Sequence, residues 1–456
     1  MAPTRPPRIP LVARLRAPVD GASLAVVRIG LGLLIAIEAL NYLTSDWIER
    51  SFLDPAFHFT YAGFGWVQPW PGVGMYLHFA ALALLGLLLA LGVAHRVAAP
   101  LLAIGFAYVF LLDKAEYLNH FYAAILFLVL IAVTPADRAL SLRARRHPER
   151  PRTVPTWAVW ILRFQVGVIY AYAGLAKLGD DWLAGEPMST WLLSSSDLPL
   201  VGSLLAGEHA GLLFSWAGAA YDLAIVPLLL WPRTRAPAFA LVVAFNLTNW
   251  IIFDIGIFPP MMIAATSIFL DPGWPRALIR RTSELLGRTT RDDPEPVRAA
   301  AVARAPVGRM LVPLLTAWIA VQLMVPLRHH LYPGLVHWSE EGHRFSWHMK
   351  LRQKDGLATF YAVDPATGDR RELELDGLIT ERQHIRASYQ PDMLAQLARR
   401  LADRERRADR ESAIRVTAPI SLNGRPASLL VDPTVDLASV EPGLGPASWI
   451  TPEPPR

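Results

Sequence analysis

The chain has 456 residues, of which 53% are hydrophobic and only 18% are charged. A soluble protein of this size could not bury so large an apolar fraction in one core, so the composition indicates a membrane protein. The formal net charge of +5 does not indicate nucleic-acid binding, because the arginines fall between apolar blocks. The sequence contains no cysteine, which excludes disulfides, thiolate metal sites and cysteine nucleophiles.

Nine apolar blocks follow one another along the chain, and most approach the ~20 residues that a helix needs to cross about 30 Å of hydrocarbon. The first block carries Arg28 and Glu38, so we interpret it as a retained span rather than as a signal peptide. The eighth contains Pro259-Pro260, which predicts a kinked or broken span. The blocks comprise residues 22–40, 72–93, 97–112, 117–134, 156–178, 210–231, 236–253, 255–270 and 310–327.

The distribution of arginine predicts how these blocks are threaded. With the N-terminus in the cytoplasm, the arginine-rich segments 138–152 and 276–291 fall inside, in agreement with the positive-inside rule. Segments 41–71 and 179–209 contain few basic residues and fall outside. Because the number of spans is odd, the residues after Leu327 are also expected outside. The predicted location is therefore the cell membrane, with an extracytoplasmic C-terminal domain.

The expected fold is an α-helical multi-pass membrane protein of about eight or nine transmembrane helices, followed by a small α+β extracytoplasmic domain. We divide it into a transmembrane catalytic domain of residues 1–327 and an outer domain of residues 328–456. Turn residues and hydrophobic periodicity predict two hairpins and one amphipathic helix in the outer domain. These are strands 357–363 and 371–375 around the turn 364–369, helix 391–410, and strands 414–422 and 427–431 around Asn423-Gly424.

Lys177 is one of only four lysines in a chain that otherwise uses arginine, and it lies at the predicted outer end of the fifth block. Desolvation can keep an amine neutral, so that it acts as a base or nucleophile near neutral pH, whereas a guanidinium stays charged. The alternative is a lysine that merely extends to the membrane interface.

Asn119-His120 begins the fourth block, at the same predicted outer face. An imidazole can relay or donate a proton near neutrality, and an asparagine amide can orient an oxyanion or a carbonyl. The alternative is a histidine whose hydrogen bonds are satisfied by a neighbouring helix.

Other charged residues within or beside the blocks favour structural interpretations. Arg163 and Asp222 lie inside the fifth and sixth blocks, and we interpret them as a structural intramembrane ion pair, with a proton path as the alternative. Arg28 could join this pair. We interpret Asp180-Asp181 and Glu340-Glu341 as solvated charge rather than as acid–base couples.

The chain shows no motif for a bound metal. His329-His330 and His343 lack zinc-site spacing, and no phosphate loop, nucleophile elbow or dinucleotide fingerprint occurs. His78 and His120 are the only candidates for haem ligation inside the blocks, and their estimated depths leave that alternative open.

Six segments resemble those of vitamin K-dependent gamma-carboxylases and their bacterial HTTM-type membrane relatives, and together they span most of the chain. The longest runs from Gly174 through Lys177, Trp182 and Gly185 to Met188, and resembles A-G-x-x-K-L-x-x-x-W-x-x-G-x-x-M. The others are Asn119-His120-Phe-Tyr122, Phe253-Asp-Ile-Gly256-Ile-Phe258, Trp274-Pro-Arg276, Ser346-Trp347-His-Met349 and Asp432-Pro-Thr-Val435-Asp436.

The resemblance implies an enzyme that uses reduced vitamin K or menaquinol with O2 and CO2, and that carboxylates glutamate in a peptide with coupled quinol epoxidation. Lys177 would be the base for the quinol, His120 would manage the proton or the carbanion, and Asn119 would orient the quinol oxygen. The residues expected to bind the quinol are Asn119, Tyr122, Tyr170, Trp347 and Met349. Neither a metal nor a nucleic acid is expected, and the expected partners are membrane lipid, the quinol and a glutamate-containing peptide or protein.

The chain also departs from the family pattern. Asn246 occupies a position where we associate a histidine with the family, and Ala176 replaces a second lysine of the animal enzymes. One alternative is therefore a quinol epoxidase or oxygenase without glutamate carboxylation. A second is a transporter or non-catalytic binding module, for which the proline-interrupted eighth block would be the substrate path.

Overall fold

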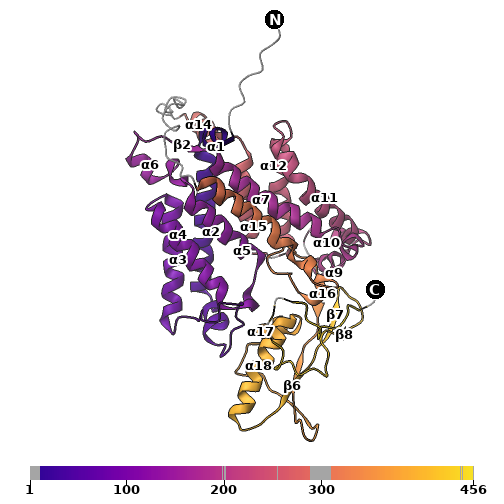
Figure 1. Ribbon diagram of the computed structural model, residues 1–456. Coiled ribbons are helices and arrows are strands. Elements are labelled where there is room, and N and C mark those ends of the chain that lie inside the picture. The colour runs from indigo at the N-terminus through magenta and orange to yellow at the C-terminus, as the bar shows by residue number, and fades with distance from the viewer. Residues whose placement is uncertain are drawn as a thin grey trace.

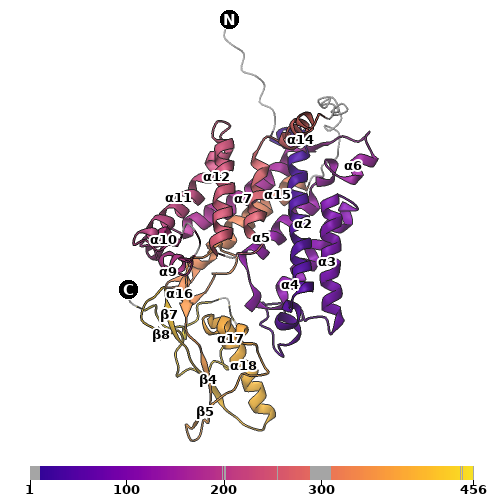
Figure 2. The same cartoon turned by 180° about the vertical axis from the view of Figure 1, so that it is seen from behind.

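A computed structural model describes residues 11–197, 199, 202–253, 255–287, 310–441, 443 and 445–454 of the protein. A bundle of long helices is followed by a smaller C-terminal domain of helices and strands, which covers one end of the bundle (Figure 1; Figure 2 shows the reverse side). The short helices α6 (Leu142–Arg146) and α14 (Trp274–Leu285) lie at the opposite end.

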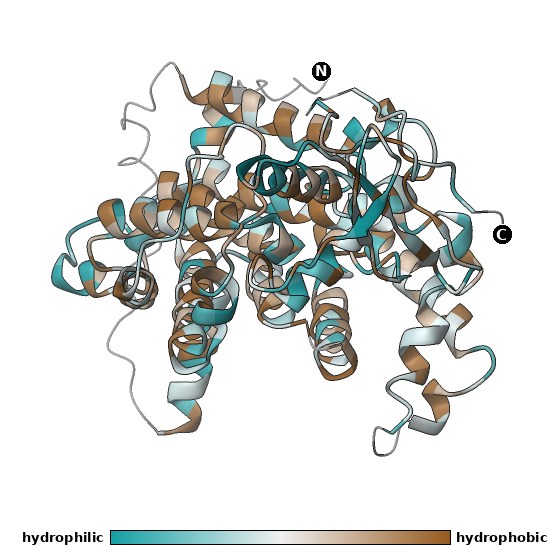
Figure 3. Cartoon of the chain, turned by 90° about the horizontal axis from the view of Figure 1, so that it is seen from below, coloured by the Kyte–Doolittle hydropathy of each residue, from teal (hydrophilic) through white to brown (hydrophobic). Residues whose placement is uncertain are grey.

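In the described residues, seven helices are long and apolar enough to cross a membrane, and hydrophobic residues run along them (Figure 3). Two shorter apolar helices, α5 (Asn119–Val133) and α13 with η4 (Phe258–Phe269), coincide with the remaining two predicted blocks. The predicted multi-pass helical fold is therefore confirmed. The long helices are α2 (Ala22–Thr44), α3 (Val73–Leu91), α4 (His95–Leu112), α7 (Thr156–Ala176), α11 (Ala210–Leu230), α12 (Arg235–Phe253) and α15 (Leu311–Leu327).

Short elements connect the spans. Strands β1 and β2 pair antiparallel at the end of the bundle that carries α6, with Val19 opposite Val154. The short connecting elements are α1 (Leu11–Arg16), β1 (Pro18–Asp20), η1 (Glu49–Leu53), η2 (Lys114–Glu116), η3 (Ala136–Arg138), β2 (Thr153–Pro155), α8 (Asp180–Leu183), α9 (Met188–Leu193) and α10 (Gly202–Leu205).

Pro259 and Pro260 do not kink a helix. They stand in the first turn of α13, which begins at Phe258, where a missing backbone N–H costs no intrahelical hydrogen bond. The predicted kink or break of the eighth block at these prolines is therefore wrong, because they start a short helix. The described residues 255–257, which precede α13, are not helical.

Glycines allow α2 and α3 to pack closely. A Cβ atom added to Gly32 would lie 2.6 Å from the carbonyl oxygen of Gly86, and one added to Gly86 would lie 2.7 Å from that of Gly32. Such contacts between small residues let membrane helices gain van der Waals packing. Beside this contact Arg28 is fully buried and donates hydrogen bonds to the carbonyl oxygens of Ala90, Ala136, Ala139 and Leu140.

The C-terminal domain contains two three-stranded sheets, with strand orders β5-β4-β6 and β3-β7-β8. Its hairpin around residues 364–369 is confirmed, since β4 and β5 pair antiparallel. The hairpin at Asn423-Gly424 is also confirmed by β7 and β8, and both turn residues have positive φ angles. The strands are β3 (Lys354–Asp355), β4 (Thr359–Val363), β5 (Arg370–Glu372), β6 (Ala413–Thr417), β7 (Pro419–Leu422) and β8 (Ser428–Leu429).

The predicted single strand 414–422 is divided between the two sheets, because β6 pairs with β4 whereas β7 pairs with β3 and β8. The predicted amphipathic helix is present as α18 (Pro391–Arg407), whose apolar face, including Met393, Leu397 and Leu401, is completely buried. The remaining helices are η5 (Arg328–Leu331), α16 (Val336–Ser339) and α17 (Glu381–Ser388).

Candidate active site

Lys177 lies at the end of α7 and forms an ion pair with Asp222 of α11, with 2.5 Å between Nζ and Oδ2. Both side chains are buried, and Nζ also lies 3.5 Å from the carbonyl oxygen of Ala173. The ring of Trp182 is 5.4 Å from Nζ, a distance compatible with a cation–π contact. Lys177 therefore does not extend into solvent, and its only carboxylate partner among the described residues is Asp222.

The close approach of α7 and α11 depends on small residues. A Cβ atom added to Gly174 would lie 2.8 Å from side-chain atoms of Leu223, next to Asp222 in the chain. A Cβ atom added to Gly218, one turn before Asp222 in α11, would lie 3.7 Å from the ring of Trp182 and 3.9 Å from Lys177 Cε. A larger residue at position 174 would push the helices apart and lengthen the ion pair.

The predicted pairing of Arg163 with Asp222 is wrong. Arg163 donates hydrogen bonds to the carbonyl oxygens of Ile268, Phe269 and Leu270 and stacks over the ring of Trp160. These carbonyl groups end α13 and η4, where the helix leaves its last acceptors without intrahelical donors. Arg28 is likewise held by carbonyl groups and does not join Asp222.

Tyr170 also contacts the neighbourhood of Asp222. Its hydroxyl lies 3.3 Å from that of Tyr221, the residue before Asp222, and the Tyr221 ring stacks on Phe245 with centroids 3.7 Å apart. Asn246, which replaces the histidine expected from the family, donates to the carbonyl oxygen of Val242. Tyr170 thus contacts the residue that precedes Asp222 in α11.

Asn119 is held on both sides of its amide. The Tyr117 hydroxyl donates to Asn119 Oδ1 at 3.0 Å and accepts a hydrogen bond from the backbone N–H of Phe345 at 2.7 Å. Asn119 Nδ2 donates to the carbonyl oxygen of His348 at 3.4 Å. The amide orientation of Asn119 is therefore set by the C-terminal domain and by Tyr117.

His120 contrasts with Asn119 because its ring is surrounded by apolar groups. It meets Phe121 edge-on, with centroids 4.9 Å apart, and approaches Phe258 at 6.2 Å. Gly256 leaves space beside it, since an added Cβ atom would lie 3.9 Å from Nε2. No hydrogen bond to His120 occurs within the described residues, so both ring nitrogens are available to a ligand.

Trp347 packs against the start of α5. Its ring is fully buried and stacks on Tyr122 with centroids 5.0 Å apart, while its Nε1 has no hydrogen-bond partner within the described ranges. Met349 packs against the same apolar core. Phe345, Trp347 and Lys350 all have φ angles near +60°, which costs about 1 kcal/mol or more at a residue with a side chain. The Ser-Trp-x-Met segment is therefore held in a strained backbone conformation.

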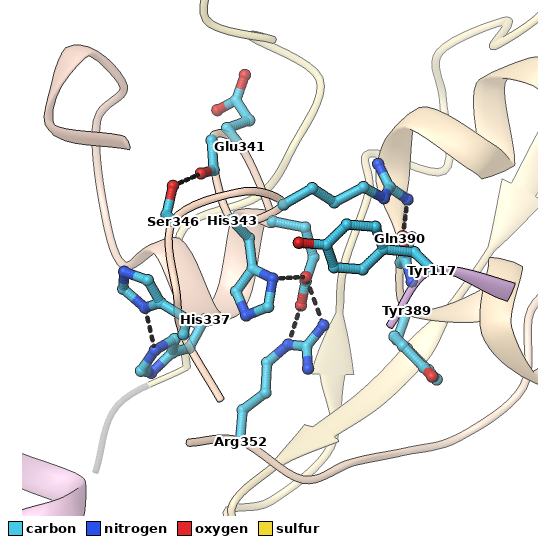
Figure 4. A network of polar contacts seen from close by, with 12 residues as sticks. Tyr117, His337, Glu341, His343, Ser346, Arg352, Tyr389 and Gln390 are labelled. Atoms are coloured by element: carbon cyan, nitrogen blue, oxygen red, sulfur yellow. Dashed lines mark hydrogen bonds and ion pairs between the residues drawn. The ribbon is translucent and has the colours of Figure 1, made fainter. Parts of the chain in front are cut away.

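A polar network that we did not predict surrounds this segment (Figure 4). His337 and His348 form a hydrogen bond of 2.9 Å between ring nitrogens, and His343 Nδ1 lies 3.5 Å from Glu340 Oε2. Arg352 and Lys354 also bind the Glu340 carboxylate. The prediction that Glu340 is solvated is thus wrong, since it is buried and shared among three cationic or polar partners.

Burial and neighbouring charge set the protonation states in this network. Although burial would raise the pKa of Glu340, Arg352 and Lys354 hold it well below its ordinary value. Burial, followed by the charge of Arg352, lowers the pKa of His337 to about 4. Burial, followed by the neighbouring histidines, lowers the pKa of His348 to about 2. These histidines are therefore neutral at physiological pH, beside an ionised glutamate.

Asn119-His120 and Lys177 lie at the same end of the bundle, under the C-terminal domain. Asn119 contacts this domain at His348, and Asp181, which follows Lys177, binds Arg425 and lies 2.8 Å from Asn423 Nδ2. The prediction that Asp181 is solvated is therefore wrong. In the described part of the chain, no hydrogen bond, ion pair or ring contact joins Lys177 directly to His120. That both open onto one pocket stays a prediction.

Two protein families match successive parts of the chain. The HTTM domain matches residues 16–274, and the lumenal domain of vitamin K-dependent gamma-carboxylase matches residues 307–455. The chain belongs to the HTTM family and is a relative of the vitamin K-dependent gamma-carboxylases. The resemblance found in the sequence is thereby confirmed. No solved structure matches the chain significantly.

In this gamma-carboxylase relative, the C-terminal domain that follows α15 is called the lumenal-type domain. It is attached to the segment that precedes Asn119. Asp113 accepts a hydrogen bond of 2.6 Å from Gln383, Lys114 binds Asp392 at 2.7 Å, and a bidentate pair joins Glu116 to Arg382. Tyr117 completes the series through Phe345. Four of five consecutive residues, 113 to 117, thus hold α5 to the lumenal-type domain.

The gamma-carboxylase relative has a cavity of ≈ 1320 Å³ between the loop around residues 56–68 and the lumenal-type domain. Its wall includes Lys114 and Arg344, which both bind Asp392 of the same wall, as well as Arg328 and Trp449. Neither Lys177 nor His120 contributes to this wall. The cavity therefore adjoins the segment that holds Asn119 but is separate from the Lys177–Asp222 pair.

Proposed function

We propose that this protein is a quinol-dependent gamma-glutamyl carboxylase, which couples epoxidation of a reduced naphthoquinone to carboxylation of glutamate in a peptide. The observation that carries the proposal is the buried Lys177–Asp222 pair at the end of the bundle that the lumenal-type domain covers. A solvated lysine could not serve as a base near neutral pH, whereas one in a desolvated pair can exchange its proton with its partner.

Residues beside Asn119 fit an aromatic quinol. Tyr122 and Trp347 offer stacked rings, and Trp347 Nε1 is a buried donor that has no partner in the described part of the chain. Reduced vitamin K or menaquinol, with O2 and CO2 as co-substrates, would supply an acidic hydroxyl and, once oxygenated, a base strong enough to deprotonate glutamate. Met349 and Tyr170 complete the set of residues that we assign to quinol binding.

Lys177 takes up the quinol proton at Nζ in this proposal. The proton already shared with Asp222 must first move to Oδ2, which leaves a neutral amine beside a neutral carboxylic acid. Both forms of the pair carry no net charge, so the transfer does not add charge to the bundle interior. Asp222 is thus the positioning residue and proton acceptor for Lys177.

Asn119 and His120 have separate roles. Asn119 has one amide N–H that is not engaged by His348, and this group is oriented by Tyr117 to donate to the quinol oxygen. His120 has no hydrogen-bond partner in the described residues, and its unpaired nitrogen can accept or return the glutamate proton. Asn119 and His120 are the first two residues of α5, so the start of this helix places the oriented amide next to the imidazole.

The test is reconstitution of the purified protein in lipid with reduced menaquinone or vitamin K, O2, labelled bicarbonate and a glutamate peptide. The native protein is compared with Lys177→Ala, and Arg281→Ala, an exposed arginine of α14, serves as a control. Epoxide and label in the peptide are expected from the native and control proteins only. Equal epoxide from Lys177→Ala would contradict the role of Lys177.

Two other results identify the alternatives. Epoxide without label in the peptide identifies a quinol oxygenase that does not carboxylate glutamate. Absence of quinone turnover under every condition contradicts the enzyme and favours a transporter or binding module.

A further inference from the structure

A second cavity, of ≈ 320 Å³, lies between the start of α4, the end of α5, η3 and α6. These elements lie at the end of the bundle opposite the lumenal-type domain (Figure 1). The cavity is distant from Lys177 and Asn119 in the fold, so it belongs to neither the proposed reaction nor the peptide. Its lining residues are His95, Arg96, Ala132, Val133, Thr134, Pro135, Asp137, Arg138, Arg143, Ala144, His147, Arg150 and Pro151.

Positive charge dominates this wall. Four arginines line it, at positions 96, 138, 143 and 150, against a single carboxylate, that of Asp137. Arg143 already binds Asp137, and Arg138 donates to the carbonyl oxygen of Thr153 at 2.9 Å. Burial, together with the nearby charges of Arg143 and Arg96, lowers the pKa of Arg138, although Asp137 opposes this effect. Arg150 lies 3.9 Å from Glu149, which is not part of the wall. Among the residues of the wall itself, arginines therefore outnumber carboxylates by four to one.

His95 provides a second indication of a ligand. It is 3% exposed, its Nε2 lies 3.0 Å from the carbonyl oxygen of Thr134, and its buried Nδ1 has no hydrogen-bond partner among the residues that the structure describes. His95 is also the first residue of the 18-residue helix α4, whose N-cap residue Ala94 provides no capping side chain. A helix start without a side-chain cap, beside several arginines, favours an anion.

The position of the cavity favours an anion that is attached to a lipid. Val133 lines the cavity and is 63% exposed, and Val97 on α4 is 59% exposed. Exposed apolar residues on spanning helices face hydrocarbon, so acyl chains can lie along α4 and α5 directly below the arginines. Basic pockets between spanning helices at the cytoplasmic surface are a recurring site for anionic headgroups. The volume suits a phosphate group with a small substituent.

We propose that this cavity binds the phosphate of an anionic phospholipid headgroup. Arg96 and Arg150 hold the phosphate oxygens by charge-assisted hydrogen bonds, because both are exposed at the mouth of the cavity. Arg138 and Arg143 supply a fixed positive field behind them. The acyl chains of the lipid remain in the bilayer against Val97 and Val133. The proposal is independent of the quinol chemistry.

The test measures lipid binding to the purified full-length protein by native mass spectrometry and by the midpoint of thermal unfolding. The probes are phosphatidylglycerol, phosphatidylcholine and inorganic phosphate. The double variant Arg96→Gln/Arg150→Gln is compared with Arg145→Gln/Arg146→Gln, which removes the same charge from exposed arginines of α6 outside the cavity wall. Arg96→Lys/Arg150→Lys retains the charge and controls for folding.

Phosphatidylglycerol should bind the native protein and raise its unfolding midpoint, and phosphatidylcholine should do neither. Affinity for phosphatidylglycerol should fall about tenfold or more in the cavity variant, since each basic residue near an anionic headgroup contributes about 1 kcal/mol. The control and lysine variants should stay within about threefold of the native affinity.

Three results would overturn the proposal. Equal loss of binding in the Arg145/Arg146 control would mean that the lipid is attracted by the general positive charge of this surface and not by the cavity. Equal binding of phosphatidylcholine would mean that the headgroup charge is irrelevant. Inorganic phosphate that saturates the cavity and displaces phosphatidylglycerol would assign the site to a free anion instead of a lipid.

Discussion

Lys177 Nζ lies 2.5 Å from Asp222 Oδ2, and this ion pair joins the end of α7 to the middle of α11 inside the bundle. The pair gives the proposed base a fixed position and a group with which it can exchange a proton. Removal of either partner leaves a buried charge without compensation, which is costly in a low-dielectric environment. The two residues should therefore act as a unit in catalysis and in stability.

Asp222→Asn should reduce quinol epoxidation by about 10²- to 10³-fold, because the amide can neither accept the proton of Lys177 nor hold Nζ by charge. The measurement is initial epoxide formation at saturating quinol. Glu38→Gln, which changes another carboxylate within a span, is the matched control and should keep most of the activity. Native turnover by Asp222→Asn would refute the proton-accepting role.

Tyr117→Phe should lower the turnover number about tenfold, because Asn119 loses the hydrogen bond that orients its amide. Substrate affinity should change less than turnover if Tyr117 acts only through orientation. Tyr172→Phe is the control, since it also removes a hydrogen-bonded hydroxyl, which donates to the backbone carbonyl of Leu323 and not to Asn119. An equal loss in both variants would mean that the effect is one of general stability.

Glu116 and Arg382 should couple energetically across the two domains. Their bidentate bonds of 2.8 and 2.9 Å predict a coupling of about 0.5–1 kcal/mol in a double-mutant cycle, because Arg382 is partly exposed. The cycle uses Glu116→Gln, Arg382→Gln and the double variant, with chemical unfolding as the measurement. Strictly additive effects would show that this pair does not hold the domains together.

The stability of the lumenal-type domain should fall in acid. In the folded protein the pKa of His337 is about 4, below its value of about 6.5 in an unfolded chain, owing to burial and then Arg352. The unfolded state therefore binds an extra proton between these values. The stabilising contribution is complete above pH 6.5 and is lost as the pH falls toward 4.

His337→Gln should take up about one proton fewer on unfolding. The slope of its unfolding free energy against pH should therefore be smaller by about 1.4 kcal/mol per pH unit within that window. Glu340, Lys354 and Asp181 also face His337, so they must be kept unchanged in the comparison. Unfolding curves recorded between pH 4.5 and 7 provide the measurement, with exposed His209→Gln as the control. An unchanged slope in His337→Gln would contradict the assignment.

Much of the local structure was predictable because it depends on neighbouring residues. Apolar length determined the spans, and Asn423-Gly424 determined a hairpin whose turn needs positive φ angles. Pro259-Pro260 indicated a helix boundary, but the sequence did not show that a helix begins there. Proline is compatible with the first turn of a helix and disrupts its interior, so the same residues fit both interpretations.

The network around Glu340 was not predictable from its segment. Two adjacent acidic residues usually indicate solvated charge, and nothing nearby in the sequence indicates burial. Arg352 and Lys354 come later in the chain than Glu340. They reach its carboxylate only because the strained turn at Phe345 and Trp347 folds the segment back. The repeated histidines at 337, 343 and 348 were the one available signal.

The sequence by itself determined that the chain is a multi-pass membrane protein and which family it resembles. It also indicated that Lys177 lies at the end of its helix and Asn119 at the start of its helix. These properties follow from hydrophobic length and local order, which the chain carries without reference to its fold. Only the tertiary structure decided that Asp222 pairs with Lys177 instead of Arg163. Ion-pair partners depend on the rotation and depth of packed helices, which hydrophobic length does not encode.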